Sequence, residues 1–304
     1  KLIIGFKNKL RRRTMTSDSF DFRIVSYPLI EKRILKWIDK YVKDNQLQSL
    51  VVGVSGGIDS AVVSTLCAKV RVPVFALGMP IHQDSTQESM SDFHLAWLEE
   101  KYPNVKKIKI DLTDLFETFK KTMGDYAHDE LALANTRSRL RMITLYQIAG
   151  KYNGVVVGTG NKVEDYGVGF FTKYGDGGVD ISPIGDLYKT EVRRLGEHLG
   201  VDKRFIEAVP TDGLWGDKRT DEDQLGATYD DLEEVMEKLA PGGSEYHEDN
   251  YELYKGGVYD VYKKWNTKNK HKMEPIPTFR LEDPFDHSIY KETDWEKPSK
   301  RKID

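Results

Sequence analysis

A short apolar run that leads directly into a glycine-hinged turn constrains this chain more than any other feature. Residues 51–60 read Val-Val-Gly-Val-Ser-Gly-Gly-Ile-Asp-Ser, in which the apolar run predicts a buried strand and Ile58 opens a helix. The glycines permit a tight turn, and the unpaired amides at the start of a helix attract an anion. The segment therefore predicts a strand–turn–helix unit that binds a phosphate group.

The polar residues of this turn indicate a nucleotide phosphate. Asp59 would repel a bound phosphate unless a cation lay between them, which indicates Mg²⁺, and Ser60 supplies a hydroxyl donor. The lysine of a Walker-type loop is missing. Glycines that serve only the geometry of the turn are the plainer alternative, which the Ser, Asp and Ser at fixed offsets disfavour. The residues assigned to nucleotide phosphates are Gly53, Ser55, Gly56, Gly57, Ile58, Asp59 and Ser60.

Strand-like and helix-like segments alternate along the middle of the chain. Strands are expected at 50–54, 72–77, 105–110 and 154–158, and helices at 30–41, 58–69, 86–101, 112–122 and 131–151. This alternation predicts the α/β class, with a doubly wound parallel sheet and helices on both faces. Ligands of such sheets bind beyond the carboxyl ends of the strands.

The later part of the chain has a different texture. Residues 167–178 are rich in glycine and aromatic residues and are expected to form a functional loop, and further helices are expected at 189–199, 229–239 and 252–265. The expected organisation is an N-terminal extension (1–25), one α/β domain (26–281) and a polar C-terminal tail (282–304).

Composition excludes several classes of protein. The 304 residues carry a net charge of −3, which disfavours a nucleic-acid partner. The only cysteine, Cys67, falls at an apolar helix position, which excludes an internal disulfide framework and a multi-cysteine zinc site. No run approaches the roughly 18 apolar residues of a membrane span. We therefore expect a cytoplasmic protein without a membrane partner.

A second cluster of polar residues follows the fourth expected strand. Residues 158–164 read Gly-Thr-Gly-Asn-Lys-Val-Glu, which places Thr159 and Glu164 at the same sheet edge as the first turn. Glu164 is a candidate for a second magnesium ligand beside Asp59, because Mg²⁺ takes one or two carboxylates plus substrate phosphates. An ordinary polar surface loop is the alternative.

Two stretches resemble a known family. Ser55–Ser60 resembles the S-G-G-x-D-S loop of the ATP pyrophosphatases, the PP-loop enzymes that split ATP between its α and β phosphates. The run Phe170–Asp180, with the segment 186–192 that reads Asp-Leu-Tyr-Lys-Thr-Glu-Val, closely resembles the signature of NAD synthetases. With Asn135–Arg141 and other matches, the resemblance extends from about residue 30 to 280.

The resemblance implies a fold of the adenine nucleotide α-hydrolase type and a reaction in two halves. The carboxylate of nicotinic acid adenine dinucleotide (deamido-NAD) attacks ATP, which releases pyrophosphate, and ammonia then displaces AMP to give NAD. The residues that the resemblance implies for catalysis are Asp59, Lys189 and Thr211, and those for ATP also include Thr159. The residues implied for deamido-NAD are Arg139, Lys173, Asp176, Asp180, His271 and Lys272, with Arg141 as a further partner. His271 and Lys272 are expected after a helix, in a segment that closes over ATP.

Two departures from the family pattern affect these assignments. Where relatives have Arg-Leu-Pro-Tyr after the second strand, this chain has Gly78-Met79-Pro80-Ile81, which leaves the adenine contacts open. One additional residue between Glu164 and Phe170 lets Asp165 compete with Glu164 as the second metal ligand.

The nitrogen source, the assembly and the rival functions complete the expectations. A fused glutamine amidase needs a cysteine nucleophile and several hundred further residues, so we expect free ammonia as the substrate; whether a separate glutaminase supplies it is open. Relatives of this size imply a homodimer. The rivals are another ATP pyrophosphatase, such as an asparagine or GMP synthetase, and a nucleotide-binding module without turnover. The Phe170–Asp180 run disfavours the first, and Asp59 with Glu164 and Lys189 disfavours the second.

Overall fold

A computed structural model describes residues 26–83, 85–211, 220–240 and 256–279 of the chain. The chain divides into two units, residues 1–273 and 274–304, and every helix and strand named below belongs to the first. The expected extension (1–25) and tail (282–304) lie outside the described residues. No helix in the described ranges is both long enough and apolar enough to span a membrane.

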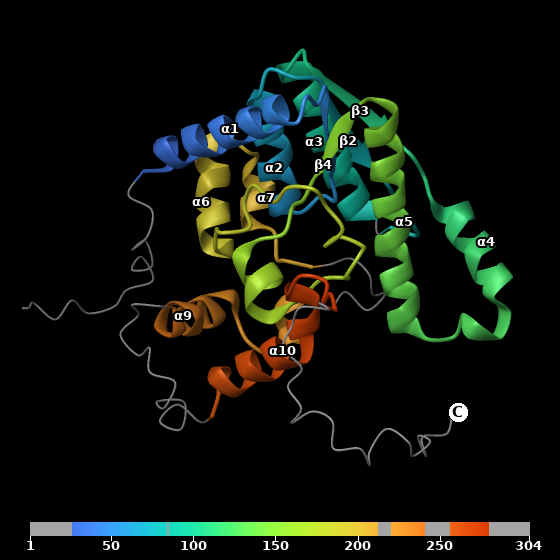
Figure 1. Ribbon diagram of the computed structural model, residues 1–304, viewed down its shortest axis with the longest axis vertical. Helices are drawn as coiled ribbons and strands as arrows, with labels where there is room; N and C mark the ends of the chain where they lie inside the picture. The colour runs from blue at the N-terminus through green and yellow to red at the C-terminus, as the bar shows by residue number, and fades with distance from the viewer. Residues whose placement is uncertain (1–25, 84, 212–219, 241–255, 280–304) are drawn as a thin grey trace, which may run out of the picture. The chain divides into compact units, whose positions relative to one another are not determined.

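A parallel sheet forms the centre of the first unit (Figure 1). Its strands are β1 (Ser49–Gly53), β2 (Val74–Gly78), β3 (Val105–Lys109) and β4 (Gly154–Val157), in the order β3-β2-β1-β4. Val51 of β1 lies opposite Phe75 on one side and Val156 on the other. The sheet order reverses at β1, because β2 lies on one side of it and β4 on the other, so the loops after β1 and β4 flank the crevice where such sheets bind ligands.

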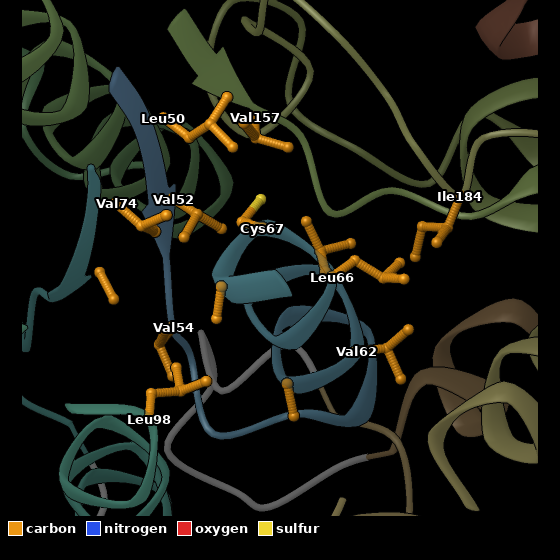
Figure 2. Packing of buried hydrophobic residues seen from close by; sticks show 14 of the residues in the cluster. Leu50, Val52, Val54, Val62, Leu66, Cys67, Val74, Leu98, Val157 and Ile184 are labelled. Atoms are coloured by element: carbon orange, nitrogen blue, oxygen red, sulfur yellow. The ribbon is translucent and has the colours of Figure 1, made fainter. Parts of the chain in front are cut away.

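Helices cover both faces of the sheet, which confirms the doubly wound α/β class. Leu50 and Val52 point toward Leu66 and Cys67 of α2 (Figure 2). Val51, which alternates with them, packs in a separate cluster on the opposite face. The helices of the first face are α1 (Tyr27–Asp44), α2 (Ile58–Lys69), α3 (Ser85–Lys101), α6 (Lys189–Leu199) and α7 (Lys203–Glu207). Those of the second are α4 (Thr113–Met123), which leads into the 3₁₀ turn η1 (Gly124–Tyr126), and α5 (Glu130–Lys151).

A third apolar cluster joins the segment after β4 to helices from late in the chain. Val163 and Val168 come from a π-helical turn, η2 (Val163–Val168), and pack with Tyr229 and Leu232. The helices that contribute to this cluster are α8 (Asp221–Leu225), α9 (Tyr229–Leu239) and α10 (Val258–Met273). The turn η2 and the helices α8, α9 and α10 thus form a cluster of their own beside the segment that follows β4.

Most expected elements are present, and their differences have physical causes. The second strand starts at Val74 instead of Val72, because Pro73 has no N–H to donate to the sheet. The prediction that the last helix ends at Trp265 was wrong, since α10 continues to Met273. Polar contacts hold its final turns where apolar periodicity is lacking: Asn266 Nδ2 donates to Gly167 O at 2.8 Å, and Asn269 Nδ2 donates to Val168 O at 2.9 Å.

Candidate active site

The turn between β1 and α2 adopts a backbone conformation that only glycine tolerates. Gly56 has a φ of +91°, and a Cβ at this position would lie 2.6 Å from the carbonyl oxygen of Gln87 in α3. Ser91 of α3 donates its hydroxyl to Val54 O at 2.7 Å, which fixes the start of the same turn. The close approach of α3 therefore requires a glycine and sets the path of the loop.

Hydrogen bonds within the turn fix its conformation. Ser60 Oγ accepts from Ser55 N at 3.1 Å and donates to Gly57 O at 3.0 Å. Gly57 is the N-cap of α2, so no side chain caps the first turn of this helix. The first amides of an α-helix have no intrahelical partner, and here a side-chain cap does not satisfy them either. The turn can therefore accept an anion at the amino end of α2.

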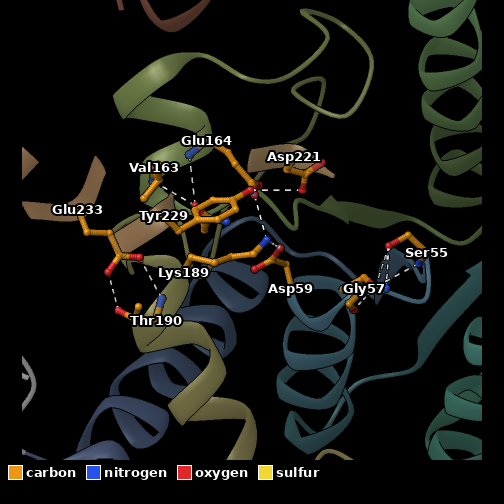
Figure 3. A network of polar contacts seen from close by, with 12 residues as sticks. Ser55, Gly57, Asp59, Val163, Glu164, Lys189, Thr190, Asp221, Tyr229 and Glu233 are labelled. Atoms are coloured by element: carbon orange, nitrogen blue, oxygen red, sulfur yellow. Dashed lines mark hydrogen bonds and ion pairs between the residues drawn. The ribbon is translucent and has the colours of Figure 1, made fainter. Parts of the chain in front are cut away.

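The first residue of α6, Lys189, joins the two loops that flank the crevice. Its Nζ lies 2.5 Å from Asp59 Oδ2 and 2.9 Å from Glu164 Oε1 (Figure 3). The Lys189 side chain is only 4% exposed. Asp59 follows β1 and Glu164 follows β4, so the sheet topology brings together residues that are far apart in the sequence. The site thus combines an ammonium group and two carboxylates at the edge of the phosphate-binding turn.

The members of this cluster shift one another's pKa values. Burial raises the pKa of Asp59 above its ordinary value, although Lys189 opposes that shift. Burial alone would lower the pKa of Lys189, but Asp59 and Glu164 outweigh burial and raise that pKa above its ordinary value. Burial raises the pKa of Glu164, but Lys189 and the Tyr229 hydroxyl outweigh it and lower that pKa below its ordinary value. An ammonium group that stays protonated next to a phosphate site can offset negative charge that develops on the phosphate.

The donor set fits a magnesium ion that also binds phosphate. Asp59 Oδ1 is buried and has no hydrogen-bond partner in the described part of the chain. Glu164 supplies a second carboxylate close by. Among the described residues, no group of three or more His, Cys, Asp and Glu side chains could hold a metal by itself. Two carboxylates without further protein ligands match the usual Mg²⁺ site, where substrate phosphates and water complete the coordination.

The two candidates for the second carboxylate ligand have different surroundings. Glu164 contacts Lys189, whereas the Asp165 carboxylate packs against Gly160, where a Cβ would lie 2.1 Å from Asp165 Oδ2. Burial first and Glu164 second raise the pKa of Asp165 well above its ordinary value. Glu164 and Asp165 both lie in the π-helical turn η2, which is wider than an α-helical turn.

Two residues of the site were missed by sequence reasoning. Tyr229 donates its hydroxyl to Glu164 Oε1 at 2.6 Å, and its OH also lies 3.4 Å from Asp221 Oδ2. The Tyr229 side chain is 1% exposed. Helical spacing marks Tyr229 only as a core position, and Asp221 lies in the short helix α8, so no sequence signal connected either residue with Glu164. Thr211 is exposed at the end of a described range, next to residues 212–219, which lie outside it.

The residues predicted to bind deamido-NAD gather around the loop after η2. Arg139 Nη2 donates to Lys173 O at 3.3 Å, and Lys173 Nζ donates to His271 O at 2.6 Å. Lys272 Nζ donates to Phe171 O at 2.7 Å. His271 and Lys272 belong to the last turn of α10, so the expectation that they follow the helix was wrong. The loop and the end of α10 therefore form one basic surface.

Two predicted acidic ligands of the substrate organise the protein itself. Asp176 Oδ1 accepts from Ser138 Oγ at 2.6 Å and from Thr172 N at 3.0 Å. Asp180 accepts from Val156 N at 2.7 Å and from Tyr146 OH at 2.9 Å. These bonds tie the loop to α5 and β4, which gives both carboxylates a structural role in addition to any contact with a substrate.

The segment after β2 is held by an arginine from α5. Arg141 Nε donates to Met79 O at 2.9 Å, and its Nη2 donates to Gln83 Oε1 at 3.0 Å. Burial, and to a lesser degree Arg137, lowers the pKa of Arg141 to about 10. Phe170 packs edge-on against Trp265 of α10, so its ring anchors the loop.

Comparisons with known proteins agree with this architecture. The family model described as NAD synthase matches residues 30–276. Relatives named NH(3)-dependent NAD(+) synthetase include those of Archaeoglobus fulgidus (37% identity, 85% of this chain and 99% of the relative) and Methanocaldococcus jannaschii (38% identity, 82% and 95%).

Solved structures show the same fold. The NMN synthetase of Francisella tularensis has a TM-score of 0.73 at 28% identity and is matched over 85% of this chain and 100% of its own. The NH3-dependent NAD synthetase of Campylobacter jejuni, solved with a nitrate ion, has a TM-score of 0.67 at 27% identity over 84% and 100%. On its sequence and its fold, this chain belongs to the NAD synthase family.

Proposed function

We propose that this chain catalyses the ATP-dependent amidation of deamido-NAD to NAD with ammonia, the last step of NAD biosynthesis. The observation that carries the proposal is the Lys189 ammonium between Asp59 and Glu164, at the edge of a phosphate-binding turn. Curated relatives that are 37% and 38% identical over most of the chain are named for the same ammonia-dependent activity. AMP and pyrophosphate are the other products.

The chain's own residues suit the cleavage of ATP between its α and β phosphates. The uncapped amides at the start of α2 bind the departing diphosphate, and Lys189 offsets the charge that develops on it. Phosphoryl transfer depends mainly on positioning and charge stabilisation, so no covalent protein intermediate is needed. Thr159 and Thr211 are assigned to ATP contacts with the residues of the turn.

Asp59 and Glu164 are the proposed ligands of magnesium. When bound, Mg²⁺ would neutralise part of the charge on the phosphates. Tyr229 holds Glu164 through a short hydrogen bond and thereby orients one of the two carboxylates.

The acid dinucleotide is assigned to the basic surface around the loop after η2. Arg139, Lys173 and Lys272 supply positive charge there, with His271 at its edge. Asp176 and Asp180 keep the loop in place beside them. The adenylate that forms must be kept from water until ammonia arrives, so we assign a water-excluding role to the end of α10.

We also propose that the enzyme is a cytoplasmic homodimer. The helices that cover the second face of the sheet, α4 and α5, and the turn η1 between them expose large apolar side chains to solvent. These include Tyr126 at 85%, Leu131 at 58% and Ile143 at 57% exposure. Exposed apolar surface of this kind is typical of protein–protein contacts. Sedimentation of the active enzyme as a monomer would contradict the dimer. The lone cysteine supports a reducing compartment.

The test of the proposed function is a product assay with a matched pair of variants. Purified enzyme is incubated with deamido-NAD, Mg-ATP and ammonium, and AMP, pyrophosphate and NAD are quantified. We expect equal amounts of the three products, a fall in turnover of about 10²-fold or more for Asp59→Asn, and unchanged turnover for Asp114→Asn, an exposed acid on α4. Near-normal turnover of Asp59→Asn would refute the assignment.

A second candidate function is favoured by one comparison. The NMN synthetase structure has a higher TM-score, 0.73, than the NAD synthetase structure, 0.67. The same assay with the acid mononucleotide in place of the dinucleotide decides between them. We expect the dinucleotide to have the higher kcat/KM, and a preference for the mononucleotide would favour the alternative.

A further inference from the structure

Lys189 fills the space between the two carboxylates that are proposed to hold magnesium. Its Nζ lies 2.5 Å from Asp59 Oδ2 and 2.9 Å from Glu164 Oε1, and Figure 3 shows the ammonium between them. Mg²⁺ binds carboxylate oxygens at about 2.0–2.1 Å. A divalent ion held by both carboxylates would lie in the position of the ammonium or directly beside it. The two cations therefore compete for the same pair of carboxylates.

In the nucleotide-free protein, burial and the two carboxylates hold the Lys189 ammonium in place. The Lys189 side chain is 4% exposed, so it is shielded from water, and Tyr229 covers it with its ring centroid 5.0 Å from Nζ. A buried ammonium that loses its carboxylates becomes an uncompensated charge, which is strongly unfavourable. A divalent ion that entered beside the ammonium would be repelled by it. Both effects oppose metal binding in the absence of another anion.

A polyphosphate would supply that anion. The backbone of Lys189 is fixed, because Glu233 accepts from both Thr190 N at 3.0 Å and Thr190 Oγ1 at 2.5 Å at the start of α6. The lysine side chain is a flexible stem, which can redirect its ammonium while the helix stays in place. An ammonium drawn onto a phosphate leaves Asp59 and Glu164 open at the moment when a cation is required.

We propose that Lys189 is an internal cation that keeps the Asp59–Glu164 pair closed to divalent metal until a nucleoside polyphosphate draws its ammonium away. This inference rests on the proposed role of the two carboxylates as metal ligands. Metal then enters with the nucleotide and not before it. Because coupling between two ligands is reciprocal, the nucleotide raises the affinity for metal by the same factor as the metal raises the affinity for nucleotide.

The test measures metal binding without turnover. Mn²⁺ is titrated into nucleotide-free protein, and free Mn²⁺ is followed by electron paramagnetic resonance. The variants are Lys189→Met, which removes the cation, Lys189→Arg, which keeps it, and Lys189→Met with Glu164→Gln, which also removes a ligand. We expect Lys189→Met to bind one Mn²⁺ about tenfold or more tightly than wild type. Lys189→Arg should bind Mn²⁺ as weakly as wild type, and the double variant should lose the tighter Mn²⁺ binding of Lys189→Met.

Thermal unfolding gives a second readout that a merely structural lysine would not produce. Lys189→Met leaves two buried carboxylates without their cation, so we expect its Tm to fall and Mg²⁺ to restore it. Mg²⁺ without nucleotide should leave the Tm of wild type unchanged. A Lys189→Met protein whose Tm does not respond to Mg²⁺ would speak against a metal site that the ammonium closes.

The outcomes separate this inference from the proposed function. If nucleotide-free wild type binds Mn²⁺ as tightly as Lys189→Met, Lys189 does not exclude the metal and the inference fails. Should Lys189→Met not fold, wild type is compared with Glu164→Gln: equally weak binding supports the inference, and binding that is present in wild type and lost in the variant overturns it. If wild type does not bind Mn²⁺ even with α,β-methylene-ATP present, Asp59 and Glu164 are not metal ligands, and that part of the proposed function fails instead.

Discussion

Replacement of Tyr229 by phenylalanine isolates one hydrogen bond of the site. The change removes the hydroxyl that donates to Glu164 Oε1 at 2.6 Å and leaves the buried ring in place. A hydrogen bond to a charged group contributes about 1.5–3 kcal/mol to stability. Glu164 keeps its contact with Lys189, so the carboxylate is not orphaned and the loss should lie near the lower limit, about 1.5 kcal/mol.

This loss has a measurable thermal and kinetic signature. For domains of this size each kcal/mol shifts Tm by about 2 °C, so we expect Tyr229→Phe to melt about 3 °C below wild type. Because Tyr229 orients a proposed metal ligand, the Mg²⁺ concentration for half-maximal turnover should also rise. Tyr262→Phe is the matched control, since Tyr262 packs against the same cluster and no hydrogen bond of its hydroxyl is seen in the described residues. Equal Tm and equal Mg²⁺ dependence of Tyr229→Phe and wild type would refute the reasoning.

Three further predictions concern the turn and the core. Gly56→Ala, at a φ of +91° and with its Cβ 2.6 Å from Gln87 O, should lower stability by at least about 1 kcal/mol. Gly57→Ala, whose Cβ would lie 3.5 Å from its nearest neighbour, should lower stability less; equal chemical denaturation midpoints of the two variants would contradict this. Burial raises the pKa of the Cys67 thiol to about 12, so the native protein should not react with a thiol reagent below its unfolding transition, and fast modification of folded protein would show the core to be open. Burial lowers the pKa of His94 to about 4, so the unfolded chain binds the extra proton between about pH 6.5 and 4. Acidification from pH 7 to 5 should therefore destabilise wild type by about 2 kcal/mol more than His94→Gln. Parallel profiles of stability against pH for the two proteins would argue against a buried neutral histidine.

The parallel sheet and the phosphate-binding turn were predictable because each depends on local sequence. The run 51–60 contains the strand, the glycine hinge and the helix start in ten consecutive residues, and α2 begins at Ile58 as expected. Strand and helix alternation then sets the topology, which places Asp59 and Glu164 at adjacent strand ends. Lys189 was predicted only from the family signature, since nothing local marks a helix-starting lysine as buried between two acids.

What could not be predicted depends on contacts between distant segments. Tyr229 lies 65 residues from Glu164 and falls on the apolar side of its helix. Its spacing therefore predicts a core residue and gives no indication that its hydroxyl binds a carboxylate. The extension of α10 to Met273 depends on Asn266 and Asn269, whose amides bind carbonyls of η2 and are invisible to apolar periodicity. Asp180, assigned to the substrate by resemblance, has both oxygens engaged within the protein.

A crystal structure with α,β-methylene-ATP and Mg²⁺ tests the proposed site most directly. We predict that the β and γ phosphates lie against the amides of residues 56–60, with Lys189 in contact with a phosphate oxygen and the metal held by Asp59 and Glu164. A well-ordered nucleotide whose diphosphate lies away from this turn would contradict the account.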